Sequence, residues 1–116
     1  MDNQQRNYSI IVVTYNNANG LRRTLQSIRQ LDYTHKEVVV IDGGSKDDSL
    51  SVIAENQDII TTSVSEKDNG IYNAMNKGVK LVTGDYVVFM NAGDEFADKD
   101  VLSVVNAYDG DILLGG

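Results

Sequence analysis

Four short, unbroken apolar runs constrain the fold of this chain more than any other feature. They are residues 10–13, 38–41, 87–90 and 112–114. The runs do not alternate with polar residues, so both faces of each segment would be buried. That pattern is typical of strands in a parallel sheet with helices on both sides. A weaker run at residues 59–62 predicts an additional outer strand.

Amphipathic patterns between these runs predict helices. Strands that alternate with helices indicate an α/β fold, with a mostly parallel sheet, right-handed crossovers and helices on both faces. We expect the four main runs to be adjacent in that sheet and a fourth helix to follow Asp98. The apolar residues of the first three helices are Leu21, Leu25 and Ile28, then Leu50, Ile53 and Ala54, then Ile71, Ala74, Met75, Gly78, Val79 and Val82.

Composition narrows the function. A length of 116 residues suits one domain, spanning 1–116, and the absence of Cys excludes disulfides and thiolate chemistry. The net charge of −7 argues against a nucleic-acid-binding surface but permits a compact phosphate site. With no apolar run of about 20 residues and a polar N-terminus, we expect a cytoplasmic protein. Because the last strand ends two residues before the chain does, we expect the domain to be truncated there.

Polar segments follow three of the predicted strands, where ligands of open α/β sheets bind. Asp42 ends the second strand and precedes two glycines, so its carboxylate is a candidate acceptor for a base N–H or a ribose hydroxyl. Ser45, with Asp48 three residues later, predicts a capping box for the next helix. Tyr15 is a candidate to stack on a nucleobase, with partly buried packing as the alternative.

Asp94 follows the fourth run through a loop of small residues. One carboxylate, together with a diphosphate and water, can complete the oxygen coordination sphere of Mg²⁺ or Mn²⁺. The alternative is an acidic loop that caps the helix near Asp98. No Ser-His-Asp or Cys-His arrangement can be assembled from this sequence.

Taken together, four segments resemble the family-2 inverting glycosyltransferases of the GT-A fold, whose donor-binding half is Rossmann-like. The match extends over nearly the whole chain, and the order and spacing of the segments make it specific. The segments are residues 9–16, residues 40–49 with the pattern D-[GD]-x-S-x-D-x-[ST], residues 68–78 with 83–86, and residues 89–96, which resemble a DxD-like metal loop.

The resemblance implies a role for individual residues. It assigns Asp94 to a divalent cation, Mn²⁺ or Mg²⁺, that bridges the donor diphosphate. Two departures stand out, since many members have an acid at the position of Gly93 and Asp at that of Asn73. The implied nucleotide-binding residues are Thr14, Tyr15, Asn16, Asp42 and Asp68.

The implied activity is transfer of a sugar, with inversion, from a nucleotide-diphosphate donor to an acceptor hydroxyl. UDP-sugar is the best guess for the donor, a saccharide or lipid-linked molecule for the acceptor, and cell-surface polysaccharide biosynthesis for the process. The family's general base and acceptor region lie beyond residue 116, so we expect this chain alone to bind donor without transferring sugar. We also expect self-association through the truncated face, and a full-length protein peripheral to the inner face of the membrane.

Three alternatives were compared with this interpretation. A receiver domain requires an acid pair after the first strand, and residues 14–17 have none. A Rossmann dehydrogenase requires G-x-G-x-x-G there, which residues 16–20 do not supply. The third alternative, a non-catalytic module that binds a sugar nucleotide, remains open.

Overall fold

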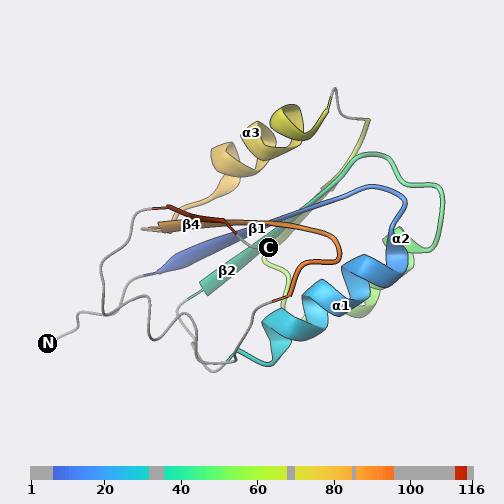
Figure 1. The fold of residues 1–116 in the computed structure, drawn as a ribbon, viewed down its shortest axis with the longest axis horizontal. Coiled ribbons are helices and arrows are strands. Elements are labelled where there is room, and N and C mark those ends of the chain that lie inside the picture. The colour runs from blue at the N-terminus through green and yellow to red at the C-terminus, as the bar shows by residue number, and fades with distance from the viewer. Residues whose placement is uncertain (1–6, 32–35, 68–69, 85, 96–111, 115–116) are drawn as a thin grey trace, which may run out of the picture.

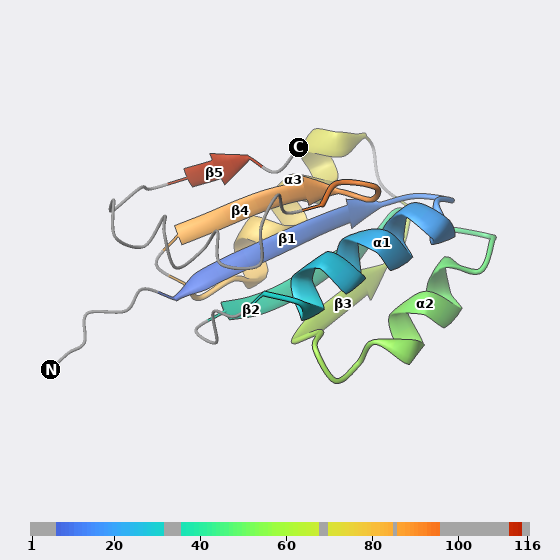
Figure 2. The same cartoon turned by 60° about the horizontal axis from the view of Figure 1, so that its bottom comes forward.

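A parallel sheet with strand order β3-β2-β1-β4-β5 forms the centre of the structure (Figures 1 and 2). The computed structural model describes residues 7–31, 36–67, 70–84, 86–95 and 112–114. The predicted parallel arrangement and the adjacency of the four main runs are both confirmed. The strands are β1 (Tyr8–Thr14), β2 (Lys36–Asp42), β3 (Thr62–Ser65), β4 (Tyr86–Asn91) and β5 (Ile112–Leu114).

Helices cover both faces of the sheet, as predicted. Figure 1 shows α1 (Ala18–Arg29) and α2 (Ser49–Glu55) on one side and α3 (Ile71–Leu81) on the other. The strand order explains this arrangement. The chain steps from β1 to β2 to β3 in one direction, and α3 then carries it back across the sheet to β4. Since crossovers are right-handed, reversing the direction moves the connecting helix to the opposite face.

The central strand β1 is buried on both faces, which is why its residues 10–13 are all apolar. Ile10 and Val12 belong to the larger core beneath α1, and Ile11 belongs to the smaller core beneath α3. All three side chains are fully buried. Each contributes about 1.5–3 kcal/mol to folding through the burial of apolar surface.

The packing of α3 onto β1 depends on the absence of a side chain at Gly78. A Cβ atom placed there would lie 2.5 Å from Cγ2 of Ile11. Ala74, one helical turn before Gly78, also lies on the predicted face and is buried against Ile11. Val79 and Leu81 lie outside that contact and are 46% and 40% exposed. The predicted stripe therefore placed Val79 on the wrong side.

The outer strand lies three residues later than the sequence predicted. The amides of Ile59 and Ile60 donate to the carbonyl of Asn56 and close the turn after α2. They are therefore unavailable for pairing with β2, and the Ile60 side chain enters the core beneath α1. Pairing begins between Val39 and Thr62 instead.

The predictions for α2 were wrong in two respects. Leu50 is 49% exposed and Ala54 is also exposed, whereas Val52 and Ile53 are buried. The helix begins after Asp48, whose side chain makes no capping hydrogen bond, so the predicted capping box does not form. The fourth helix predicted after Asp98 lies outside the described residues. Among those described, no helix is both long and apolar enough to cross a membrane.

Glu37 joins three segments at the amino end of the sheet. Its Oε1 accepts hydrogen bonds from Ser9 Oγ of β1 and from the Thr83 amide, both at 2.5 Å. Ser9 Oγ in turn accepts from the Gly84 amide at 2.9 Å, which fixes the turn before β4. Partial burial alone would raise the pKa of Glu37, but the hydrogen bonds from Ser9, Thr83 and Gly84 outweigh it and lower that pKa.

We expect Glu37→Gln to lower the free energy of unfolding by about 1 kcal/mol at neutral pH, because a charge-assisted acceptor is lost from a half-buried site. The folded pKa of Glu37 lies below its unfolded value, so its contribution is complete above the unfolded pKa of about 4.3 and is lost as pH falls through the folded pKa. Urea unfolding from about pH 7 to pH 3 should show wild type and variant converging in acid.

The exposed Glu55, at the end of α2, provides the control. Glu55→Gln should follow wild type at every pH. A constant gap between wild type and Glu37→Gln down to the lowest pH would contradict the assignment.

Candidate functional site

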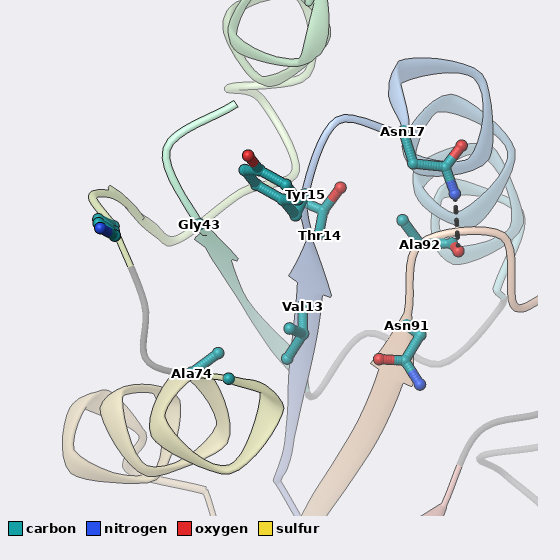
Figure 3. A pocket seen from close by; sticks show the side chains of 10 residues that line it. Val13, Thr14, Tyr15, Asn17, Gly43, Ala74, Asn91 and Ala92 are labelled. Carbon is teal, nitrogen blue, oxygen red and sulfur yellow. Dashed lines mark hydrogen bonds between the residues drawn. The ribbon is translucent and has the colours of Figure 1, made fainter. Parts of the chain in front are cut away.

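A cavity of about 520 Å³ opens at the carboxyl ends of the central strands. It lies between β1 and β4, where the order of the strands reverses. Ligands of open α/β sheets bind at this position. Figure 3 shows Val13 and Ala74 pointing toward each other between β1 and α3, with Asn91 entering from β4. The lining residues are Val13, Thr14, Tyr15, Asn17, Gly43, Lys67, Gly70, Ala74, Asn91 and Ala92.

Thr14 and Tyr15, both predicted from the sequence, line this cavity at the end of β1 (Figure 3). Tyr15 is 60% exposed, so the packing alternative does not hold and its ring face is accessible. Thr14 is buried, and its Oγ1 has no hydrogen-bond partner among the described residues. An unsatisfied buried hydroxyl costs about 1–3 kcal/mol, so a polar partner from a ligand or water would be stabilising there.

Asp42 lies at the end of β2 as predicted, but it is fully buried. Its Oδ2 accepts from the amides of Gly44 and Ser45 and from Ser65 Oγ, at 3.1, 2.8 and 2.8 Å. Its Oδ1 accepts from Ser45 Oγ at 2.5 Å. A carboxylate accepts about four hydrogen bonds, so Asp42 already holds the turn after β2, and its contact with a nucleoside stays a prediction.

Ser45 joins the turn after β2 to the loop after β1 through hydrogen bonds. Because its hydroxyl proton goes to Asp42, its oxygen is left to accept from the Asn16 amide at 2.7 Å. Asn16 Oδ1 accepts from the Lys46 amide at 2.8 Å, which closes a second bond between the two loops. Asn16 has a φ of +46°, a left-handed conformation that Asn tolerates. Asn16 thus fixes its neighbour Tyr15 and does not itself line the cavity.

Asp47 makes a third connection between the same loops. Its Oδ2 accepts from the Ala18 amide at 3.1 Å, at the start of α1, and its Oδ1 accepts from the Ser49 amide at 2.9 Å. Hydrogen bonds from Ser49, and a weaker one from Ala18, hold the pKa of Asp47 below its usual value. The side chain therefore remains ionised and bonded at any pH near neutrality.

Three lining residues with polar side chains, Asn17, Lys67 and Asn91, were not among the predicted site residues. Asn17 caps α1 by accepting from the Gly20 amide, and its Nδ2 donates to the Ala92 carbonyl at 3.2 Å (Figure 3). Asn91 ends β4. Lys67 follows β3. The sequence prediction missed it because the outer strand was predicted three residues too early. Had the strand been placed at 62–65, Lys67 would have stood at a strand end like the others.

Asp94 lies in the turn that follows β4, beside the cavity but not in its lining. Its Oδ2 accepts from the Asn91 amide at 2.8 Å, and its own amide donates to the Asn91 carbonyl at 2.9 Å. No hydrogen bond between described residues engages Oδ1. The arrangement suits a single protein carboxylate that shares a cation with a ligand. Within the described segments, no group of three or more His, Asp or Glu side chains is arranged to hold a metal ion by itself.

The structure therefore divides the predicted residues. Thr14 and Tyr15 line the cavity, Asn16 and Asp42 support its rim, and Asp94 lies at its edge. Asp68 lies outside the described residues. The ligand contacts of all six stay predictions.

Comparison with known proteins identifies relatives of this arrangement. The family model described as "Glycosyl transferase family 2" matches residues 9–114. A PGL/p-HBAD biosynthesis glycosyltransferase of Mycobacterium bovis is 36% identical over 111 residues, covering 90% of this chain and 42% of its own length. The chain spans less than half the length of the curated relatives that it matches.

Solved structures show the same architecture. A mannosyltransferase from Pyrobaculum calidifontis, in complex with GDP-Man and Mn²⁺, has a TM-score of 0.82 and 28% identity over 91% of this chain and 33% of its own. TarS from Staphylococcus aureus, in complex with UDP-GlcNAc, has a TM-score of 0.80 and 25% identity over 88% of this chain and 30% of its own.

We expect Ser45→Ala to lower the free energy of unfolding by about 1–3 kcal/mol, because it removes the hydrogen-bond partner of Asp42 Oδ1 and that of the Asn16 amide. Hydrogen exchange of the Asn16 amide should accelerate more than that of amides within β1. Urea unfolding and amide exchange measure the two effects.

Ser51→Ala is the matched control, since Ser51 is exposed on α2. It should change the free energy of unfolding by no more than about 0.5 kcal/mol. Unchanged exchange at Asn16 in Ser45→Ala would show that the bridge does not hold the loop.

Proposed function

The chain belongs to glycosyl transferase family 2, and from this premise we propose that its cavity holds the nucleotide end of a sugar donor. The observation that carries the proposal is the cavity itself, which lies at the switch point of the sheet with an accessible aromatic ring at its rim. Its volume of about 520 Å³ falls within the usual range for small-ligand sites. Family membership supports sugar transfer as the activity.

The base and ribose would bind at the end of β1. The exposed ring of Tyr15 offers a stacking surface, and the unpartnered hydroxyl of Thr14 offers a hydrogen bond. Related structures contain UDP-GlcNAc in one case and GDP-Man in another, so relatives use more than one base. A uridine donor remains our choice. Stacking alone does not select it, because every base has a π-face.

The diphosphate needs positive charge, which the loops around the cavity supply poorly. Several of their amides already donate within the protein: Gly43 to the Thr14 carbonyl, Gly44 and Ser45 to Asp42, and Ala92 to the Val13 carbonyl. Among the lining residues that the structure describes, Lys67 is the only cation. In a chain with a net charge of −7, this favours a divalent cation, Mn²⁺ or Mg²⁺, as the main counter-charge.

Asp94 is the residue that we propose to hold this cation, with Lys67 adding a second positive charge. When bound, the ion would supply charge neutralisation of the departing nucleoside diphosphate. Asp94 fits this role because no hydrogen bond between described residues engages its Oδ1, and because it closes the turn that begins at Asn91 and Ala92, which line the cavity. The relative that was solved with GDP-Man also contained Mn²⁺.

Transfer to the acceptor is proposed for the whole protein. We infer inversion at the sugar, an acceptor hydroxyl on a saccharide or a lipid-linked molecule, and a role in cell-surface polysaccharide synthesis. We assign no general base among the described residues. We propose that residues 1–116 alone bind donor without transferring sugar, the behaviour that a non-catalytic binding module would also show.

Replacing Tyr15 with Ala should weaken UDP binding about tenfold, because stacking on an aromatic side chain contributes about 1–3 kcal/mol. Tyr15→Phe retains the ring and should bind nearly as well as wild type. Titration calorimetry in the presence of Mn²⁺ measures both. Equal affinities of wild type and Tyr15→Ala would exclude the stacking role, and a panel with GDP and other nucleoside diphosphates would show which base is preferred.

Asp94→Asn should remove the Mn²⁺ dependence of UDP binding while the chain stays folded, because the amide keeps an oxygen for the Asn91 amide but lacks the charge that holds the ion. The test compares UDP titrations with and without Mn²⁺. Glu95→Gln, at the exposed neighbouring position, should behave like wild type. If Asp94→Asn retains the full Mn²⁺ effect, the cation lies elsewhere.

A further inference from the structure

Thr24 holds the turn that contains Asp94, although it lies on α1 and far from that turn in sequence. Its side chain is fully buried. Thr24 Oγ1 donates to the carbonyl of Asp94 at 2.7 Å and accepts from the amide of Gly93 at 2.9 Å. A single hydroxyl therefore bonds to the backbone on both sides of the Gly93–Asp94 peptide.

This use of a helical threonine is unusual. A Thr hydroxyl inside a helix commonly bonds back to a carbonyl three or four residues earlier. Here the Gly20 carbonyl, four residues before Thr24, accepts from the Gly93 amide at 3.0 Å. The Gly93 amide is thus shared between two acceptors of α1, one carbonyl and one hydroxyl. Helix and turn are joined through polar atoms that ordinarily bond within the helix.

The turn needs external support because its own geometry is demanding. Gly93 has a φ of +106°, a conformation that residues with a side chain rarely adopt. Within the turn, the Asn91 amide bonds to the Asp94 carboxylate. This bond fixes the carboxylate relative to the last residue of β4 but not relative to α1. Among the described contacts, the bond from the Ala92 amide to the Val13 carbonyl joins the turn to β1. The bonds of Thr24 and Gly20 and the Asn17–Ala92 bond join it to α1.

We propose that Thr24 is a positioning residue for the cation site, which acts by fixing Asp94 at the edge of the cavity. The inference rests on the proposed function, because it takes Asp94 as the cation ligand. Thr24 does not touch donor or ion. It sets the direction of the Asp94 backbone, and through it the place of Oδ1. Groups that orient a metal ligand commonly change metal affinity by roughly 10- to 100-fold when removed.

The test uses two substitutions of Thr24 in the full 116-residue chain. Thr24→Val keeps the shape and removes the hydroxyl, and Thr24→Ser keeps the hydroxyl. Each is titrated with Mn²⁺ at fixed UDP by calorimetry, and amide exchange at Gly93 is followed separately. We expect Thr24→Val to raise the Mn²⁺ concentration for half-maximal binding by roughly tenfold or more and to accelerate exchange at Gly93. Thr24→Ser should restore both toward wild type.

Thr61→Val is the matched control, because Thr61 Oγ1 also accepts from a backbone amide, that of Val38, at the other end of the sheet. It should lower stability without changing Mn²⁺ binding. If Thr24→Val binds Mn²⁺ like wild type while Asp94→Asn does not, the positioning role is wrong and the proposed cation site stands. If Asp94→Asn retains the full Mn²⁺ effect, the proposed site itself fails. If Thr24→Val loses stability and Mn²⁺ binding and Thr24→Ser restores neither, the hydroxyl is not responsible and the proposal is overturned.

Discussion

Burial of β1 on both faces is the constraint on which the rest of the structure depends. Ile10 and Val12 face α1 while Ile11 faces α3, so helices cover both faces of the strand. In the sheet, β2 lies on one side of β1 and β4 on the other, so the strand order reverses at β1. That reversal places the loops after β1, β2 and β4 at one edge, where the cavity opens. The position of the site is therefore a consequence of core packing.

Loops brought together in this way must satisfy their backbone polar groups without a regular ladder. Small polar side chains do so here. Ser45 joins the loop after β2 to that after β1, Thr24 joins the turn after β4 to α1, and Asp42 collects bonds from two amides and two hydroxyls. Each of these three side chains is buried. Ser45 acts on the loop that carries Tyr15, and Thr24 acts on the turn that carries Asp94.

The sequence was sufficient for the fold because two-sided apolar runs determine which segments become central strands. It was less informative at the edge of the sheet. In β3 only Val64 is apolar, so the sequence prediction placed the strand at the more apolar pair Ile59 and Ile60. The amides of that pair instead close the turn after α2. In the site, the strand-end argument predicted Tyr15, which lines the cavity, and Asp42 and Asp94, which do not line it and whose ligand contacts stay predictions. The role of Ser45 was mistaken, because a capping pattern in sequence does not reveal that the hydroxyl bonds across to another loop.

The same hydrogen bonds that make the loops rigid also shape the electrostatics of the site. A loop amide that donates to a carboxylate or carbonyl of the protein cannot also bind a phosphate, and most amides that the structure describes around this cavity are used in that way. Rigid loops thus leave little fixed positive charge for an anionic donor.

In this acidic chain, we propose that the positive charge comes from an exchangeable cation and from Lys67, which lines the cavity. Donor affinity would then depend on how accurately one carboxylate, that of Asp94, is held. A site with two or three acidic ligands tolerates movement of any one of them, whereas a site with one does not. This is why a buried hydroxyl on a neighbouring helix can matter to it.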